Sequence, residues 1–278
     1  MEYFRFTTGL SYTLEQLNEM HNLSFSGYLL PMETTPVELA TFYRAHQLDL
    51  AWTILMHTEA GEFVGFCCVG IRNTRSWCGN LGIAPKFRGR GLGKILLNQI
   101  ITLTREAGLK TLQLETITKN EPAFKLYKGA GFNTLRTLHS LRLTTADLRE
   151  QQANITFAPL TLELPFACLQ NQVRSCWQRE PASILSTAHE VLASTSLPAS
   201  IALCYQRTSN LLRVQSAIVS PDTEKGELAA LLVAAAEEIP QILIPSEPEN
   251  SQVLLLAREL GGRETLRFYE MELALDKD

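Results

Sequence analysis

The 278-residue sequence lacks the patterns that would place it in a membrane or on a nucleic acid. It has no uninterrupted apolar run of membrane length, and its first residues, Met-Glu-Tyr-Phe-Arg-Phe, lack the layout of a signal peptide. Its net charge of −4 and isoelectric point near 5.8 give no basic footprint for a polyanion. We therefore expect a cytoplasmic protein that binds neither membrane nor nucleic acid.

Motifs of several catalytic classes are also absent. The sequence contains no C-x-x-C pair, no H-E-x-x-H, no G-x-S-x-G elbow and no G-x-x-x-x-G-K-[ST] loop. The six cysteines and five histidines form no metal-ligand pattern, so we expect no metal, and we expect the cysteines to be reduced and buried. Cys78 is either a core residue or a neighbour of an active site.

The composition contains enough hydrophobic residues for two globular cores. Hydrophobic residues make up 45% of the chain and charged residues 19%, as in ordinary soluble proteins. The length suits two domains of about 135 residues each. The polar stretch 145–155 is a plausible junction, so we expect one domain over residues 1–145 and a second over residues 153–278.

The most informative segment is Arg88-Gly-Arg-Gly-Leu-Gly93. Its three glycines allow a tight turn whose amide hydrogens point one way, and a helix that follows adds the positive end of its dipole. Four cationic side chains surround the turn: Lys86, Arg88, Arg90 and Lys94. The segment is either an ordinary turn or a site for a diphosphate.

The neighbouring segments favour the diphosphate. A strand is expected over 77–83, closed by Ala84-Pro85, and helical periodicity runs from Lys94 to about Ala107, with Gly108 just beyond its end. Residues 111–117 alternate like a further strand. Strand, turn, helix and strand is the order that a phosphate-binding loop requires.

A second motif lies about thirty residues downstream and reads Asn120-Glu-Pro-Ala-Phe-Lys-Leu-Tyr127-Lys-Gly-Ala-Gly-Phe132. Asn120 suits a helix N-cap, and a proline is tolerated in the first turn of a helix. Gly131-Phe132 is expected to turn the chain into a last strand pair over 134–143.

These two motifs, R-x-x-G-x-G and N-x-x-A-x-x-L-Y-x-x-x-G-F, resemble the signatures of the Gcn5-related N-acetyltransferase (GNAT) superfamily over residues 3–143. The resemblance implies an α/β (α+β) fold, a mixed, mostly antiparallel sheet flanked by helices, and acetyl transfer from acetyl-coenzyme A to a primary amine. It implies that the coenzyme is held by Leu81, Gly82, Ile83, Arg88, Gly89, Arg90, Gly91, Leu92, Gly93, Lys94, Asn120 and Tyr127.

The resemblance also implies catalytic roles. Tyr127 would protonate the departing thiolate, although it could instead only pack on the cofactor. Glu115 lies where relatives that acetylate ribosomal proteins carry a glutamate that deprotonates the amine through water, although it could be an inert surface residue. Other acidic or basic groups stay open as the base: Glu33, Glu38, Asp49 and His57.

The second half repeats the first faintly. Pro221 ends a strand as Pro85 does, and Asn250 precedes Gly261-Gly262 as Asn120 precedes Gly131-Phe132. In these registers the turn and catalytic positions are replaced: Arg88 by Glu224, Gly91 by Glu227, Gly93 by Ala229, Glu115 by Pro245 and Tyr127 by Ala257. Carboxylates repel a pyrophosphate, so we expect a degenerate GNAT-like domain that binds no coenzyme A, or else another α/β domain.

The acceptor is harder to name. A second domain over the acceptor side would close the groove that a protein chain end needs, so we expect a small-molecule amine. A protein N-terminus, longer acyl donors, a non-catalytic acyl-coenzyme A sensor or scaffold, and a homodimer are left open. Residues expected to line the acceptor site are Tyr28, Met32, Glu33 and Trp52.

Overall fold

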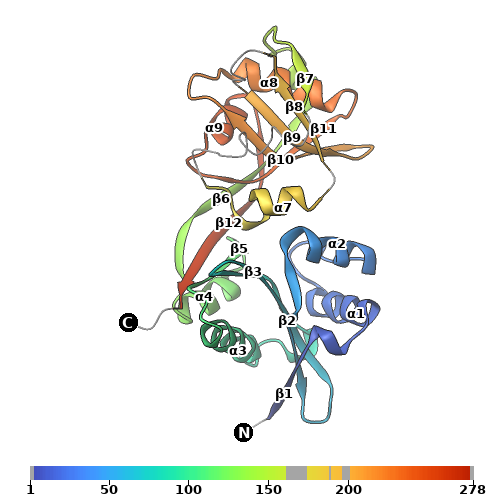
Figure 1. Ribbon diagram of the computed structural model, residues 1–278, viewed down its shortest axis with the longest axis vertical. Coiled ribbons are helices and arrows are strands. Elements are labelled where there is room, and N and C mark those ends of the chain that lie inside the picture. The colour runs from blue at the N-terminus through green and yellow to red at the C-terminus, as the bar shows by residue number, and fades with distance from the viewer. Residues whose placement is uncertain (1–2, 161–173, 188, 196–200, 276–278) are drawn as a thin grey trace. The chain divides into compact units, whose positions relative to one another are not determined.

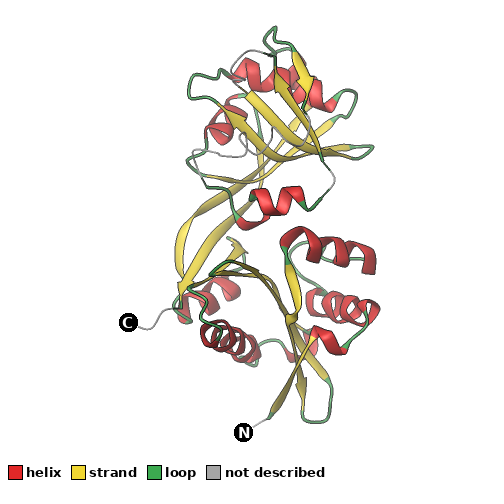
Figure 2. Ribbon diagram, in the orientation of Figure 1, coloured by secondary structure: helices red, strands yellow, loops and turns green. Residues whose placement is uncertain are grey.

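The chain forms two compact units. The computed structural model describes residues 3–160, 174–187, 189–195 and 201–275 (Figure 1). Unit 1 comprises Met1–Leu135 together with Glu270–Asp278, and unit 2 comprises Arg136–Tyr269. Each unit combines a sheet with helices (Figure 2), which confirms the expected α/β class.

Unit 1 is built on a mixed sheet with the strand order β1-β2-β3-β4-β5-β12. The pairs from β1 to β4 are antiparallel, whereas β4 and β5 are parallel. Its strands are β1 Phe4–Thr8, β2 Leu48–Thr58, β3 Phe63–Arg72, β4 Arg75–Ile83, β5 Thr111–Ile117, the start of β6 Asn133–Thr144 and the end of β12 Arg263–Ala274. The central strand β3 reads as a continuous apolar run because residues 64–69 are fully buried.

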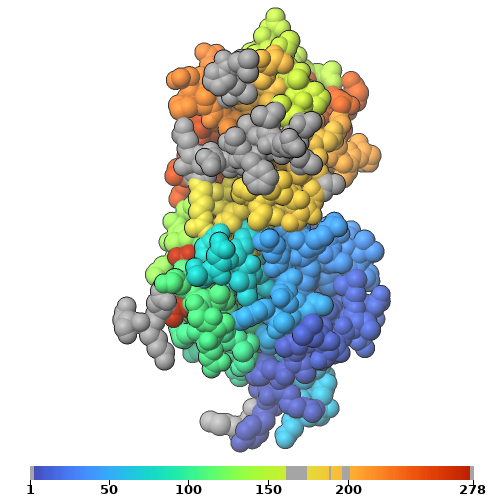
Figure 3. All heavy atoms as spheres, viewed as in Figure 1, coloured from blue at the N-terminus to red at the C-terminus, as the bar shows by residue number. Residues whose placement is uncertain are grey.

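The helices of unit 1 are α1 Leu14–Phe25, α2 Pro36–His46, α3 Leu92–Glu106 and α4 Glu121–Gly129. Capping boxes begin α1 at Thr13 and α2 at Thr35. Beyond the end of α3, Gly108 adopts a φ of +73°, which stops the helix as the sequence predicts. On the face seen in Figure 3, the blue N-terminal helices form much of the surface of unit 1.

The sheet of unit 1 opens between its two parallel strands. Strands β4 and β5 pair only where residues 75–77 face residues 111–113, and no pairing follows. Just beyond, Gly79 is the extra residue of a β-bulge against β3. A Cβ at Gly79 would lie 2.8 Å from the ring of Trp77, so only glycine fits this bulge without a shift. The two strands therefore diverge and leave backbone groups unpaired by the sheet.

Unit 2 has the strand order β12-β6-β11-β10-β9-β8-β7. Its further strands are β7 Phe157–Pro159, β8 Glu190–Ser194, β9 Ile201–Arg207, β10 Leu211–Val219 and β11 Gln241–Pro248. Its helices are α5 Thr145–Arg149, α7 Pro181–Leu185, α8 Lys225–Ala236 and α9 Gln252–Glu259. The apolar helix α8 supplies fully buried Leu228, Leu231 and Leu232 to the core of this unit.

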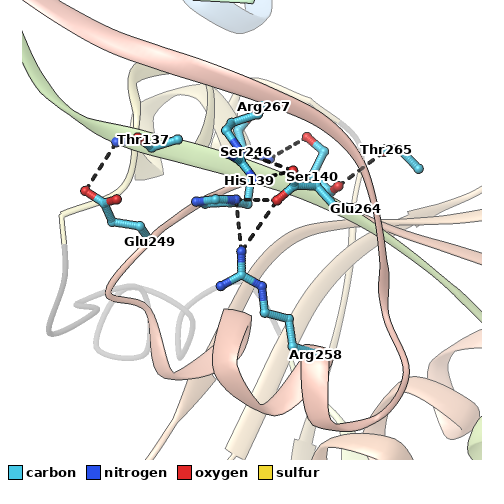
Figure 4. A network of polar contacts seen from close by, with 9 residues as sticks. All are labelled: Thr137, His139, Ser140, Ser246, Glu249, Arg258, Glu264, Thr265 and Arg267. Carbon is cyan, nitrogen blue, oxygen red and sulfur yellow. Dashed lines mark hydrogen bonds and ion pairs between the residues drawn. The ribbon is translucent and has the colours of Figure 1, made fainter. Parts of the chain in front are cut away.

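A polar network joins three elements of unit 2 (Figure 4). His139 of β6 approaches Glu264 of β12 at 2.6 Å, and Arg258 of α9 lies 3.0 Å from the same histidine nitrogen. The hydrogen bond to His139, together with Arg267, holds the pKa of Glu264 below its ordinary value, against the opposing effect of burial. The network ties β6 to β12 and α9.

Unit 2 repeats the opened sheet of unit 1. Strands β10 and β11 are parallel over residues 211–213 and 241–243 only, and Gln215 is the bulged residue against β9. These pairings place Leu211 where Arg75 lies in unit 1 and Gln241 where Thr111 lies. The same two registers follow from the prolines and asparagines of the sequence, so the predicted tandem repeat is confirmed.

The chain passes between the units within strands, because both boundaries fall inside β6 and β12. The last described residues then complete unit 1. The amide of Leu275 donates to the carbonyl of Lys110 at 2.8 Å, and the Gln113 side chain donates to Glu272 at 2.8 Å. Leu275 itself is buried, so residues from the far end of the sequence belong to the unit that carries the glycine turn.

One expected element is wrong and the others are confirmed. Residues 134–143 were expected to form a strand pair, but they form the single strand β6. The segment contains no glycine, proline or asparagine turn after position 133, and its neighbour in the sheet is β11. The proposed division of function between residues 1–145 and 153–278 stays a prediction. Among the described helices, none is long and apolar enough to cross a bilayer.

We predict that deleting residues 270–278 destabilises unit 1. The deletion removes a buried leucine and the end of β12 that lies beside β5, which costs about 4 kcal/mol and lowers the melting temperature by about 10 °C. Thermal unfolding followed by circular dichroism measures the change. A chain that ends at Leu275 is the control and should melt like the full protein. Equal melting of all three chains would show that the returning strand is dispensable.

Candidate functional site

Unit 1 contains a cavity of about 630 Å³ at the end of β4, beyond the residues that pair with β5. Its walls come from the end of α1 and the loop after it, the end of β4, the glycine turn before α3, and the start of α4. The residues that line it are Ser24, Phe25, Gly27, Tyr28, Leu29, Leu81, Gly82, Ile83, Phe87, Arg88, Gly89, Gly91, Leu92, Gly93, Lys94, Lys119, Asn120, Pro122, Ala123 and Leu126.

The glycines of the turn, Gly89, Gly91 and Gly93, line this cavity. Gly89 and Gly91 both have a φ of +76°, a conformation that favours glycine, and a Cβ on either would meet nothing within 4 Å. Glycine is therefore required by the backbone conformation and not by crowding. Gly91 is the N-cap of α3 and supplies no side-chain cap, so the first amides of α3 are left for an anion.

Arg88 fastens the turn to its surroundings. Its Nε donates to the carbonyl of Ile83 at 2.9 Å, and its Nη2 donates to the carbonyls of Ser24 at 3.1 Å and Ser26 at 2.7 Å. The guanidinium therefore joins the end of α1 to the end of β4. Its positive charge therefore lies at the cavity, while its N–H groups bond to backbone carbonyls of the protein itself.

The other cations of the turn are arranged differently. Lys86 pairs with Glu62 at 2.5 Å, and Arg90 lies over the ring of Phe87 at 5.5 Å. Lys94 lines the cavity, and so does Lys119, which the sequence analysis did not single out. Two lysines and Arg88 thus supply the positive charge of the cavity wall.

Gly82 allows α1 to form one wall of the cavity. A Cβ on Gly82 would lie 2.9 Å from the Cβ of Ser24 and 3.0 Å from its carbonyl oxygen. Any larger residue would push the end of α1 away from β4. Gly82 was expected at the cofactor site as a backbone contact, and its close approach to α1 gives a second reason for glycine.

Asn120 combines two contacts at the cavity rim. Its Oδ1 accepts a hydrogen bond from the amide of Ala123 at 3.2 Å, which caps α4. Its Nδ2 donates to the hydroxyl of Tyr28 at 3.1 Å. Tyr28 thereby ties the loop after α1 to the start of α4. Tyr28 lines this cavity, whereas Met32, Glu33 and Trp52 do not.

Tyr127 of α4 is buried and is not among the residues that line the cavity. Burial raises the pKa of its hydroxyl well above 10, and the nearby Cys78, Cys67 and Tyr28 raise it further. The Sγ atoms of Cys67 and Cys78 are 3.6 Å apart, and burial also raises the pKa of the Cys67 thiol. Tyr127 therefore keeps its proton throughout the physiological pH range. The described cysteines are buried and none of them forms a disulfide, and Cys168 lies outside the described residues.

Glu115 lies on β5 two residues past Gln113, the last residue that pairs with β4. It is partly exposed, and its Oε2 accepts a hydrogen bond from the indole Nε1 of Trp77 at 2.6 Å. Glu115 does not line the cavity itself. It stands where the two strands begin to diverge.

The other candidate bases lie elsewhere in unit 1, and none lines the cavity. Glu38 caps α2, Glu33 is exposed, and Asp49 accepts from the amide of Ala51 at 2.8 Å. Burial and the nearby Arg5 lower the pKa of His57. The described residues contain no cluster of three or more His, Cys, Asp or Glu side chains that could hold a metal ion.

The corresponding turn of unit 2 carries carboxylates in place of glycines. Glu224 occupies the N-cap of α8, and its amide donates to the side chain of Glu227 at 2.8 Å. The carboxylates of the chain therefore take the place that a phosphate would need at this helix N-terminus.

The gap between the diverging strands of unit 2 is filled as well. Nε of Arg179 donates to the carbonyl of Gln215, the bulged residue of β10, at 2.9 Å. Its Nη1 pairs with Glu247 of β11 at 2.5 Å, and the exposed fractions of Arg179 and Glu247 are 5% and 4%. Arg179 thus bridges β10 and β11 in unit 2, whereas the cavity of unit 1 is lined by residues two positions beyond the corresponding Gly79 and Ile117, namely Leu81 and Lys119.

Some residues that line the cavity could not have been identified from their local sequence. Ser24 and Phe25 end α1 and reach the cavity only because α1 packs on β4. Lys119 could have been suspected, because it directly precedes the Asn120 motif.

Comparisons with known proteins agree with this geometry. The model of the acetyltransferase (GNAT) family matches residues 14–132. The ribosomal protein bS18-alanine N-acetyltransferase of Escherichia coli (strain K12) is 30% identical over 105 residues, which are 38% of this chain and 70% of that protein. The streptothricin acetyltransferase of Streptomyces lavendulae is 34% identical over 74 residues, which are 26% of this chain and 39% of that protein.

The fold similarity extends over both units. The structure of a tandem GNAT protein from the clavulanic acid biosynthesis pathway, determined without acetyl-coenzyme A, covers 99% of this chain and 100% of its own, with a TM-score of 0.73 and 11% identity. A GCN5-related N-acetyltransferase from Sphaerobacter thermophilus covers 99% of this chain and 96% of its own, with a TM-score of 0.69 and 14% identity. At these identities the similarity shows the fold.

We predict that Tyr28→Phe weakens the binding of acetyl-coenzyme A about threefold to tenfold. The change removes the hydroxyl that accepts from Asn120, a bond worth about 0.5–1.5 kcal/mol, and leaves the ring in place. Calorimetry of acetyl-coenzyme A binding measures the effect. Tyr12→Phe, which removes a part-buried hydroxyl bonded to Thr7 instead, is the control. Equal affinities of both variants and the natural protein would exclude Tyr28 from cavity closure.

Proposed function

Because the chain belongs to the acetyltransferase (GNAT) family, we propose that unit 1 is an acetyl-coenzyme A-dependent N-acetyltransferase that acetylates a primary amine, preferably of a small molecule. The observation that carries the proposal is the cavity between the glycine turn and the diverging strands. It joins the helix N-terminus at the glycine turn to a largely apolar wall, which suits a ligand with phosphates at one end and a thioester arm at the other.

The residues of the cavity suit the coenzyme from end to end. The amides at Gly89–Gly93 would hold the pyrophosphate, with Lys94 and Lys119 adding positive charge. The backbone of residues 81–83, at the end of β4, would accompany the pantetheine arm. Acetyl-coenzyme A supplies the acetyl thioester, and the reacting end would lie where β4 and β5 diverge, near Glu115 and Tyr127.

The proposed chemistry is direct attack. Glu115, acting through a water molecule, takes a proton from the acceptor ammonium, and the amine nitrogen then forms a bond to the thioester carbonyl carbon. As the carbon–sulfur bond breaks, Tyr127 gives its proton to the departing thiolate, and the acylated nitrogen gives its second proton to water, which leaves a neutral amide. Burial raises the pKa of Tyr127, so the hydroxyl still carries its proton at neutral pH when the donor is needed. A later exchange with solvent returns each residue to its starting state.

Two acceptor classes are represented among the relatives. The Streptomyces lavendulae relative is named for acetylating streptothricin, and the Escherichia coli relative for acetylating an alanine of a ribosomal protein. The second name favours a protein N-terminus as the alternative acceptor. A non-catalytic acyl-coenzyme A sensor is disfavoured, because such a protein would have no use for the buried Tyr127 or for a carboxylate held at the opening of the sheet.

For unit 2 we propose a GNAT-like domain without a coenzyme site. Its turn is occupied by Glu224 and Glu227, and its gap by Arg179 and Glu247. Removing one partner of a buried ion pair leaves an uncompensated charge, so the pair is not expected to open for a ligand. One chain should therefore bind one molecule of acetyl-coenzyme A.

We predict that calorimetry of the natural protein finds one acetyl-coenzyme A site per chain, and that Gly91→Glu weakens it at least about a hundredfold. The new carboxylate would face the pyrophosphate, and like charges about 4 Å apart near a protein surface repel by about 4 kcal/mol. Gly108→Glu is a matched control, since Gly108 lies at the other end of α3 with a similar φ and open surroundings. Two sites, or equal binding by both variants, would contradict the assignment.

We predict that Tyr127→Phe lowers kcat about a hundredfold and changes the KM for acetyl-coenzyme A less than about twofold, because only the proton donor is lost. Steady-state assay of coenzyme A release with an amine acceptor measures both constants. Tyr43→Phe, which removes another buried hydroxyl of unit 1, is the control. Since burial raises the pKa of Tyr127, its deprotonation should produce no loss of activity below about pH 10. An unchanged kcat would show that Tyr127 only packs against its neighbours and donates no proton.

A further inference from the structure

Trp77 is a fixed point beside the opening of the sheet. Its side chain is 1% exposed, and its ring contacts His46 with centroids 5.6 Å apart and Phe42 with centroids 6.3 Å apart. The bulged Gly79 has no side chain, and this leaves room for the ring. Contacts from α2 and β4 therefore hold the indole in one orientation.

The orientation aims the one polar atom of the indole at the proposed base. The Nε1–H of Trp77 donates to Oε2 of Glu115 at 2.6 Å, a short bond of the kind made to an ionised acceptor. A donor to the charged form of a carboxylate favours ionisation, and a rigid donor also fixes the carboxylate in space. Glu115 needs both properties if it is to receive a proton.

The internal repeat offers a comparison within the same chain. In the registers set by the strand pairings, Arg213 stands in unit 2 where Trp77 stands in unit 1, and Pro245 stands in place of Glu115. Both members of the pair are therefore absent from the unit that also lacks the glycine turn. The pair is not a general requirement of this opened sheet, because unit 2 forms the same opening without it.

We propose that Trp77 is a positioning residue for the acetyl transfer, holding Glu115 ionised and oriented to take a proton from the acceptor amine. The inference rests on the proposed function of unit 1. It assigns the indole N–H a role in the reaction, whereas packing of the ring alone would not require an N–H group.

Other charged groups face the same region and must be separated from Glu115 in a test. His46 of α2 contacts the Trp77 ring, and Arg75 of β4 donates to Gln113 at 3.2 Å. The contacts of Lys110 with Leu275 and of Gln113 with Glu272 set an antiparallel register. In that register Glu270 of β12 lies across from Glu115. His46, Glu270 and Glu272 are thus the other titrating groups of this face.

The test is the pH dependence of kcat/KM in Trp77→Phe. Loss of the N–H raises the pKa of Glu115, and activity is lost as pH falls through that pKa, so the acidic limb should move up by about one pH unit. At pH 7 kcat should fall about tenfold, with the KM for acetyl-coenzyme A unchanged. Phe42→Leu, which trims a neighbour of the ring and keeps the N–H, should leave the limb in place. An unmoved limb in Trp77→Phe would overturn the proposal.

Glu115→Gln separates this inference from the proposed function. Loss of the acidic limb in Glu115→Gln assigns the limb to Glu115, and a limb that persists would assign it to His46, Glu270 or Glu272 and remove the basis of both ideas. If Trp77→Phe does not fold, the indole N–H proton of Trp77 in the natural protein serves instead. Its resonance should move upfield in Glu115→Gln, and no movement would show that the hydrogen bond is absent.

Discussion

The structure depends on one feature of backbone pairing, the early end of the parallel contact between β4 and β5. Three residues of each strand pair, and a bulge at Gly79 then turns β4 away. Buried backbone groups must find partners, so an opening in a sheet has to be filled. In unit 1 the opening adjoins a cavity with a bare helix N-terminus, which suits a ligand that carries amides along its length and phosphates at one end.

Unit 2 meets the same constraint with its own side chains. Its parallel strands also pair over three residues, and the guanidinium of Arg179 then spans the opening between a β10 carbonyl and Glu247. A buried ion pair is stable only when both charges are matched and hydrogen-bonded. The two units thus share one opened sheet, with a cavity beside the opening in unit 1 and a buried ion pair across it in unit 2.

The cavity of unit 1 is assembled from parts that are far apart in the sequence. Arg88 reaches the carbonyls at the end of α1, and Tyr28 reaches Asn120. The strand beside β5 is supplied by the last residues of the chain, through Leu275. The proposed active unit therefore requires more than the stretch that carries its motifs. A chain cut after residue 145 would lack β12, the strand that lies beside β5.

The sequence by itself determined the local features. The glycine turn, the start of α4 at Asn120, the strand over 111–117 and the repeat in the second half are set by contacts within a few residues, so they could be read directly. Only the tertiary structure decided which groups meet. It placed Trp77 against Glu115 and made residues 134–143 one strand. The physical reason is that such contacts depend on how separate elements pack, and no short segment of the sequence encodes that packing.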